Sequence, residues 1–249
     1  MPEHLLWLII ASLIVGLAKG GLSSLGSLAV PLLAIFMNPI QAAALILPVF
    51  LVTDWFAVWL YRRDASKRNV WILVPSTLAG IAIATFIVGY TPESLLLLLT
   101  GTVGLWACWR SWFGKARSES PRPAKVGPGV FWGVITGITT FITHSGAPPA
   151  QAFLLPQGLS RLAFAGTMAI TFAIGNAAKL PGYYALGLFS DFPLALASGL
   201  VAVGLIGTVA GRWIVLRLTD QAYIRIVEVM LLVLSMALFW KAFSILTGS

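Results

Sequence analysis

The chain has 249 residues, of which 59% are hydrophobic and only 10% are charged. A soluble domain carries roughly 25% charged residues, so this composition excludes an ordinary soluble domain and indicates a protein with many membrane spans. The net charge of +8 does not indicate nucleic-acid binding, because nine of the 16 basic residues lie in two short loops between apolar segments.

A membrane-spanning helix needs about 20 apolar residues, and segments of this kind follow one another along the chain. The pattern predicts an interrupted segment at about 5–37, full spans at 39–61, 70–90 and 93–112, a second interrupted segment at 129–157, and full spans at 161–187, 192–213 and 222–246. We therefore expect an all-α integral membrane protein with about eight hydrophobic segments. The expected organisation is a first membrane repeat at 1–113, a basic linker at 114–127 and a second membrane repeat at 128–249.

Each interrupted segment fits either a re-entrant pair of half-helices or one span and a re-entrant piece, and it contains a short polar break beside a titratable residue. The first break reads Lys19-Gly20-Gly21-Leu22-Ser23-Ser24, and the second reads Thr143-His144-Ser145-Gly146-Ala147-Pro148-Pro149. Irregular backbone at membrane depth is tolerated only where it is buried in protein or lines a cavity. A matching pair of such breaks is a pointer to a transporter's binding site.

The two halves also match beyond the breaks, as expected of an old duplication. The spacing from Lys19 to Pro31 equals that from His144 to Pro156, and Asp54 and Tyr61 match Asn176 and Tyr183. The basic loops at 62–69 and 110–127 are expected to be cytoplasmic. Three arginines around the last turn, Arg212, Arg217 and Arg225, favour an inverted repeat with both termini external. A parallel repeat of four plus four spans is the alternative.

Ionisable residues within the membrane are expensive and point to function. We expect the breaks to bind substrate through half-helix N-termini, which attract anions, and through the side chains or backbone of Lys19, Gly20, Gly21, Ser23, Ser24, Thr143, His144, Ser145, Gly146 and Asn176. Asp54, His144 and Lys179 are candidates for carrying a proton or forming an ion pair. The alternatives are that Lys19 extends to the interface, that His144 is neutral and bonded to a backbone carbonyl, and that Asp54 belongs to a structural pair.

Other functional classes have weaker support in the sequence. Adjacent His144 and Ser145, with Asp54, allow an intramembrane serine hydrolase as an alternative, although a triad is recognised by geometry. A channel is a further alternative. The single cysteine, Cys108, and two histidines give no metal-ligand spacing, and Walker-type phosphate loops are absent. We expect no metal and no cofactor, and a protein that is not an enzyme. The first residues, Met1-Pro2-Glu3-His4, lack the basic region of a signal peptide.

The two repeats resemble those of a known family. The runs VGLAKGGLSSLGSLAVPLLAIFMNPIQAAALILPVFLVTDWFAVWLYRR and GITTFITHSGAPPAQAFLLPQGLSRLAFAGTMAITFAIGNAAKLPGYYALG resemble the repeats of the sulfite exporter TauE/SafE family. The resemblance implies a permease of the bacterial inner membrane that moves sulfite, a small organosulfonate or a related sulfur-containing anion. We therefore expect a secondary transporter, most simply an exporter, whose partners are a small anion, the lipid bilayer and a coupling proton.

Overall fold

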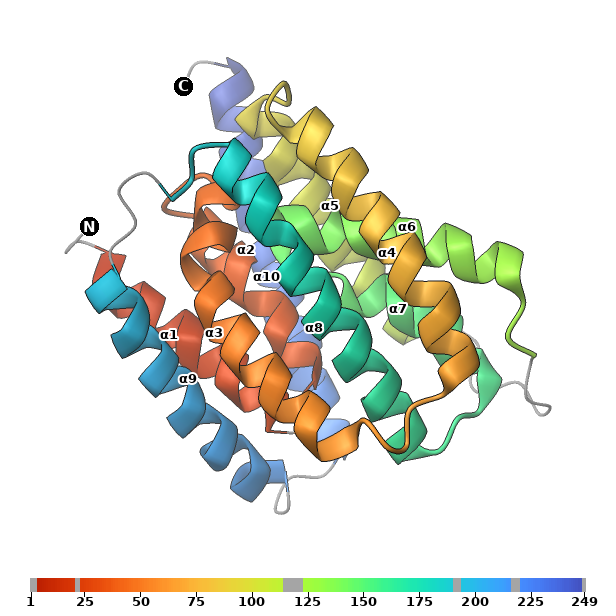
Figure 1. Ribbon diagram of the computed structural model, residues 1–249. Coiled ribbons are helices and arrows are strands. Elements are labelled where there is room, and N and C mark those ends of the chain that lie inside the picture. Colours follow the sequence, from red (N-terminus) through yellow and green to blue (C-terminus); the bar gives the residue numbers. More distant parts are fainter. Residues whose placement is uncertain (1–3, 21–22, 114–122, 190–193, 216–219, 248–249) are drawn as a thin grey trace.

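The computed structural model describes residues 4–20, 23–113, 123–189, 194–215 and 220–247, and these residues form a bundle of helices (Figure 1). In the first half, α1 (Leu5–Lys19) is followed by the short 3₁₀ helix η2 (Ser23–Leu28) and by α2 (Ala29–Ala34). The three long helices of this half are α3 (Pro39–Tyr61), α4 (Lys67–Val88) and α5 (Glu93–Phe113).

The second half has a similar order of elements, except that the short α-helix precedes the 3₁₀ helix instead of following it. A longer first helix, α6 (Val126–Thr143), is followed by the short α7 (Ala147–Leu154) and the 3₁₀ helix η3 (Leu155–Gln157). The long helices are α8 (Arg161–Ala185), α9 (Leu194–Val215) and α10 (Asp220–Thr247). The prediction of an all-helical membrane protein is confirmed, and the expected span at 39–61 coincides with α3.

The two central helices begin at matching N-caps. The Asn38 side chain accepts a hydrogen bond from the amide of Ile40, and the Ser160 side chain accepts one from the amide of Ala163. Such caps satisfy backbone donors that have no partner within the helix. Pro39 follows at the first position of α3, where a proline costs no helical hydrogen bond.

Four of the described helices are long and apolar enough to cross a membrane. Their qualifying parts are Pro39–Trp59, Lys67–Val88, Val126–Thr143 and Leu194–Gly211. One of them, α6, lies in the second interrupted segment, so that segment combines a helix of full spanning length with the short α7 and is not a pair of half-helices. The total number of full spans stays a prediction.

The long helices pack in reciprocal pairs. The helix α1 packs against α9 and α6 packs against α4, while α3 packs against α8 and α5 against α10. In Figure 1 the chain runs in opposite directions along α3 and α8, and along α4 and α9. This arrangement is what an inverted duplication would produce. The repeat boundaries at 113 and 128 stay a prediction.

Close helix contacts in two of these pairs depend on small residues. A Cβ added at Gly16 of α1 would lie 2.0 Å from the Gly204 carbonyl oxygen of α9. A Cβ added at Gly80 of α4 would lie 2.2 Å from the Val134 carbonyl oxygen of α6. Small residues let helix backbones approach closely in membrane proteins. The absence of a side chain at Gly16 and Gly80 therefore allows both helix pairs to pack at their observed separation.

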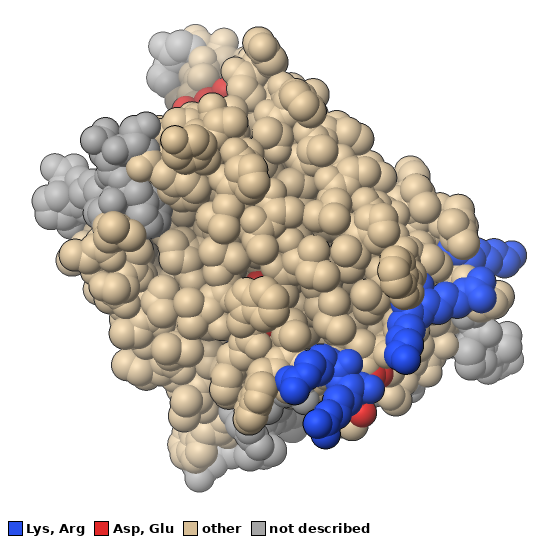
Figure 2. Space-filling model, viewed as in Figure 1, with Lys and Arg blue, Asp and Glu red and all other residues tan. Residues whose placement is uncertain are grey.

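Five exposed basic side chains gather at one end of the bundle, which we call the basic end. Its members are Arg62, Arg63, Lys67, Arg68 and Lys125, and Figure 2 shows Lys and Arg concentrated along this edge. Two contacts bring the ends of helices together there: Arg68 Nε donates to the Ala124 carbonyl at 2.9 Å, and the Ser66 amide donates to Thr167 Oγ1 at 3.0 Å. The side chains of Arg110, Arg161 and Arg212 and all of Arg117 and Arg122 lie outside the described part.

The opposite end is organised around Glu93, and we call it the Glu93 end. Lys241 of α10 forms an ion pair with Glu93 at 3.3 Å and donates to the Ala34 carbonyl at 3.0 Å. The Asn38 side chain donates to Glu93 at 3.4 Å. The start of α3, the end of α2 and the start of α5 therefore meet there, so the first broken segment returns to the Glu93 end. The second broken segment returns to the basic end, where Asn69 and Gln157 contact each other at 2.9 Å.

Candidate functional site

A cavity of about 280 Å³ lies between α3 and α8 and reaches the two breaks. Its inner wall includes Lys19, Ser27, Thr140, His144 and Asn176, and it extends along Ala57, Tyr61, Phe164 and Ala165 toward the basic end. Small-molecule sites are typically roughly 300–1,000 Å³, so the cavity suits a small ligand. Most of its wall is apolar, with a few polar groups at the deep end.

Lys19 ends α1 at the deep end of this cavity. Its Nζ forms an ion pair with Asp54 of α3, and the Asn176 amide of α8 donates to the second carboxylate oxygen. Lys19 Nζ also lies 5.4 Å from the ring centre of Phe50 and 5.8 Å from that of Phe172, within the range of cation–π attraction. The Lys19 side chain is 18% exposed and Asp54 is fully buried. The buried charge of Asp54 is therefore compensated by Lys19 and Asn176. A buried carboxylate without such partners would strongly destabilise the fold.

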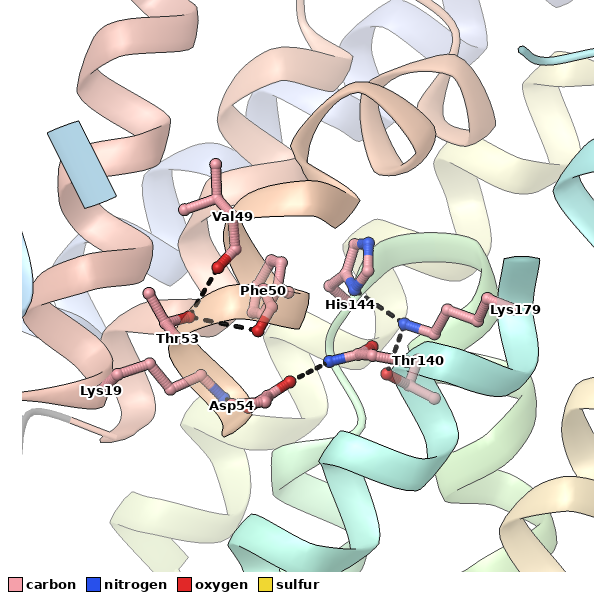
Figure 3. Close-up of polar contacts among 9 residues, drawn as sticks. Lys19, Val49, Phe50, Thr53, Asp54, Thr140, His144 and Lys179 are labelled. Atoms are coloured by element: carbon pink, nitrogen blue, oxygen red, sulfur yellow. Dashed lines mark hydrogen bonds and ion pairs between the residues drawn. The ribbon is translucent and has the colours of Figure 1, made fainter. Parts of the chain in front are cut away.

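His144 ends α6 in a left-handed conformation, with φ of 52°. This conformation is uncommon for a residue other than glycine, and it turns the chain sharply into α7. The His144 ring stacks on Phe50 with 4.3 Å between ring centres and 10° between planes. Its Nε2 lies 3.0 Å from the Ala43 carbonyl, and its Nδ1 lies 2.7 Å from Lys179 Nζ. Figure 3 shows the ring between Phe50 and Lys179.

These contacts fix the positions of the hydrogen atoms. Nε2 must carry a hydrogen because it faces a carbonyl oxygen, which can only accept. Lys179 Nζ also donates to Thr140 Oγ1 at 3.0 Å. Lys179 Nζ therefore donates to His144 Nδ1, and the pair carries one positive charge when Lys179 is an ammonium group and none when it is a neutral amine, which can make the same two donations.

The buried cluster of Lys19, Asp54, Asn176, His144 and Lys179 has an excess positive charge when Lys179 is protonated. Lys19 and the Lys179–His144 pair contribute two positive charges, and Asp54 contributes one negative charge. Of the acidic side chains that the structure describes, Asp54 alone is buried. A buried charge without a counter-ion is costly, so the protonated cluster, with its net charge of +1, favours the entry of an anion.

The side-chain oxygen of Asn176 is a further polar group available to a ligand in the cavity. The amide orientation is fixed because the Asp54 carboxylate can only accept, so the nitrogen faces Asp54 and Oδ1 faces elsewhere. This Oδ1 is buried and has no hydrogen-bond partner among the described residues, although Asn176 lines the cavity. Buried polar atoms are nearly always paired in native structures. A water molecule or a ligand hydroxyl in the cavity would satisfy it.

The two breaks touch each other behind the cavity. Ser145 Oγ donates to the Ser27 carbonyl of η2 and to the Thr143 carbonyl, both at 3.3 Å. The Ser145 amide donates to Thr143 Oγ1 at 3.2 Å. A Cβ added at Gly146 would lie 2.8 Å from Thr140 Cβ, so glycine allows the tight passage from α6 to α7. The crossing point of the breaks is therefore held by their own polar groups.

The sequence matches the sulfite exporter TauE/SafE family over residues 8–238. The chain belongs to this family. No curated protein and no solved structure matched it. As a TauE/SafE protein with these apolar helices, it is a multi-pass membrane protein of a transport family, related in general to the export of sulfite and other anions.

The geometry does not favour a serine hydrolase in this TauE/SafE protein. The two ring nitrogens of His144 face Ala43 and Lys179, not Ser145, and Ser145 donates to backbone carbonyls. Asp54 is held by Lys19 and Asn176. Within the described part of the chain, these three residues therefore do not form a nucleophile–base–acid arrangement.

The structure brings together most of the residues singled out from the sequence. Lys19, His144 and Asn176 line the cavity, Asp54 joins Lys19 to Asn176, and Lys179 lies behind the cavity wall. Thr143 and Ser145 contribute to the crossing of the breaks rather than to the cavity wall, and Gly146 packs against Thr140 beside them. Gly20 caps α1. Gly21 and the side chains of Ser23 and Ser24 lie outside the described part.

The sequence interpretation missed the aromatic walls. Phe50 and Phe172 lie on either side of Lys19, and Phe50 also carries the His144 ring. Both phenylalanines are separated by the same 122 positions that separate Asp54 from Asn176 and Tyr61 from Tyr183. That shared spacing is the sequence signal by which Phe50 and Phe172 could have been identified as site residues.

Proposed function

We propose that this protein is a secondary transporter, acting as an exporter, of a small sulfur-containing anion such as sulfite or a short organosulfonate. The observation that carries the proposal is the excess of lysines over acidic side chains in the buried cluster beside the cavity, which has a net charge of +1 when Lys179 is protonated. Lys19 and Lys179 both approach this region, whereas Asp54 supplies a single negative charge. A monoanion in the cavity would make the loaded site neutral.

The apolar part of the cavity wall favours a substrate anion that carries an organic group. Phe164, Met168 and Phe172 of α8 give the cavity an apolar side. An oxyanion head beside Lys19 and His144 would leave room for a short carbon chain against these side chains. The unpaired Asn176 Oδ1 would accept a hydrogen bond from a hydroxyl of the anion or from a water molecule bound with it.

A thermal-shift screen tests the choice of substrate. Ligands that bind only the native state stabilise it, by about 2.7 kcal/mol at a concentration of 100 times the Kd. We expect sulfite and short sulfonates to raise the Tm of the purified protein, with choline chloride and a neutral sulfone as controls. If neither sulfite nor any small sulfonate raised the Tm more than chloride did, the proposed substrate class would be wrong.

We also propose that transport is coupled to a proton held by Lys179 and His144. With an anion bound, the cluster is neutral. Without it, the cluster retains an unpaired positive charge at membrane depth, which would slow the return of the empty carrier. Loss of that proton would leave the empty cluster neutral and allow that return. Asp54, which the sequence also suggested as a proton carrier, is better suited to anchoring Lys19 because both of its oxygens already accept hydrogen bonds.

Comparing net flux with exchange tests this coupling in proteoliposomes. A carrier with a fixed charge would exchange labelled sulfite for unlabelled sulfite but would perform little net transport. A carrier that releases the proton would perform net transport that responds to an imposed pH gradient at a clamped membrane potential. Net flux indifferent to the pH gradient would reject proton coupling and would favour a channel.

The proposed setting is the bacterial inner membrane, with the basic end in the cytoplasm. Five described basic side chains gather at that end, and positively charged loops face the cytoplasm in such membranes. The Glu93 end and both chain termini are then external. In this orientation the cavity beside Tyr61 and Phe164 opens toward the cytoplasm, as an exporter waiting for substrate would.

A further inference from the structure

The central helices α3 and α8 correspond residue by residue. Their N-caps, Asn38 and Ser160, are 122 positions apart, and the same interval separates several residues of the site and its surroundings. These pairs are Phe50 and Phe172, Asp54 and Asn176, and Tyr61 and Tyr183. Because the N-caps are structural features, the correspondence does not depend on side-chain similarity alone.

Corresponding residues at the two helix starts have opposite environments. In α8 the first turns line the cavity, and their counterparts in the first turns of α3 are completely buried. The cavity residues are Phe164, Ala165, Met168 and Ala169, and the buried counterparts are Ala42, Ala43, Ile46 and Leu47, each 0% exposed. The basic end is therefore open along α8, and the Glu93 end is closed along α3.

The last turns of the two helices show the same reversal. Ala57 and Tyr61 of α3 line the cavity near the basic end. Their counterparts in α8 are Lys179 and Tyr183, which are both 0% exposed. The Tyr183 hydroxyl donates to the Phe141 carbonyl of α6 at 2.5 Å, and the two rings pack edge to face with 4.8 Å between their centres.

We propose that Lys179 is the anion-binding cation of a second half-site, which opens toward the Glu93 end when Tyr183 separates from Phe141. In that state Lys179 and Tyr183 would line a cavity as Ala57 and Tyr61 do here. Lys19 binds the anion in the cavity that opens at the basic end, and Lys179 binds it in the cavity that opens at the Glu93 end. This inference rests on the proposed transport function and assigns the binding groups on each side of the membrane.

The contacts of the two lysines suit these separate roles. Lys19 has a permanent counter-ion in Asp54, so it orients the anion while its own charge stays balanced. Lys179 is held by neutral acceptors, Thr140 Oγ1 and His144 Nδ1, so its charge remains available. His144 and Thr140 line the present cavity as well, so an anion beside them can pass from one lysine to the other over a short path.

Cysteine accessibility tests the opening, and Ala57 provides a matched control for Lys179. In a Cys108→Ser background, the Ala57→Cys and Lys179→Cys variants are treated with sulfonatoethyl methanethiosulfonate, a membrane-impermeant organosulfonate. The reagent is added to one face of oriented vesicles, with free cysteine on the other face to quench any reagent that crosses. We expect Ala57→Cys to react from the basic end and Lys179→Cys to react from the Glu93 end. Reaction of both from the basic end, or of Ala57→Cys alone, would overturn the second half-site.

Restoring the charge tests the role of Lys179 itself. We expect Lys179→Cys to lose sulfite flux and to recover it after 2-bromoethylamine alkylates the thiol and attaches a new aminoethyl ammonium group through a thioether, which sulfite does not cleave. Iodoacetamide, which adds a neutral group through a thioether, should give no recovery. If mass spectrometry shows complete modification by 2-bromoethylamine and flux remains absent, Lys179 does not act as the anion-binding cation.

The two proposals fail in different ways. Sulfite flux through the Cys108→Ser protein itself tests the transport function, whatever the labelling pattern. Sided labelling tests the alternation between the two ends, whatever anion is carried. A protein that transports sulfite but never exposes position 179 would retain the proposed function and lose the second half-site.

Discussion

Replacing Asp54 by asparagine should destabilise the protein and strengthen its response to anions. The substitution keeps the shape of the side chain but removes the only negative charge of the buried cluster, so its net charge with Lys179 protonated changes from +1 to +2. Breaking a buried ion pair costs roughly 3–5 kcal/mol. Because the Lys19 side chain is 18% exposed to the cavity, we take the lower end, about 3 kcal/mol. At about 2–4 °C per kcal/mol for a chain of this size, the Tm should fall by about 6–12 °C.

The assay is thermal unfolding of purified protein with and without sulfite. Asp64→Asn is the matched control, since Asp64 is exposed near the end of α3, and it should leave the Tm unchanged. Sulfite should raise the Tm of Asp54→Asn by more than it raises that of the unaltered protein, because the variant has a larger charge to neutralise. An unchanged Tm together with an unchanged response to sulfite would refute the account of the cluster's charge.

Three further predictions test binding, packing and orientation. Lys19→Met and His144→Ala should each weaken sulfite binding about 10- to 140-fold in a titration, since losing a charged hydrogen bond costs about 1.5–3 kcal/mol; unchanged affinity in both would remove the proposed site. Gly16→Ala should lower the Tm because its Cβ would meet the α9 backbone, whereas Gly199→Ala, with nothing within 4 Å, should not; equal Tm values would contradict the packing. A cysteine at Thr219 in a cysteine-free background should be labelled only from the cytoplasmic face, and external labelling would contradict the inverted repeat.

Much of the helical architecture was predictable because the signals are local. Long apolar runs and polar breaks mark where helices begin and end, and the expected span at 39–61 equals α3. The second break was harder, because α6 continues for 18 residues before it ends at His144. The sequence allowed either a pair of half-helices or one span and a re-entrant piece, and it did not decide between them.

The site was only partly predictable because it depends on how distant helices face each other. Intramembrane charges identified Lys19, Asp54 and Lys179, but the sequence left open which lysine pairs with Asp54. The structure pairs Asp54 with Lys19 and Asn176, while Lys179, one turn beyond Asn176, faces His144 and Thr140. The apolar walls carry no charge signal, so they emerged only from the packing of α3 against α8.

The most direct test of the central claim is the efflux of labelled sulfite from proteoliposomes at a fixed membrane potential. The account predicts protein-dependent efflux that saturates with sulfite, is inhibited by short sulfonates and responds to a pH gradient. It also predicts that Lys19→Met and Lys179→Met abolish this efflux in protein that remains folded. Efflux no greater than that from empty liposomes, or undiminished efflux in both lysine variants, would contradict transport through the buried cationic cluster.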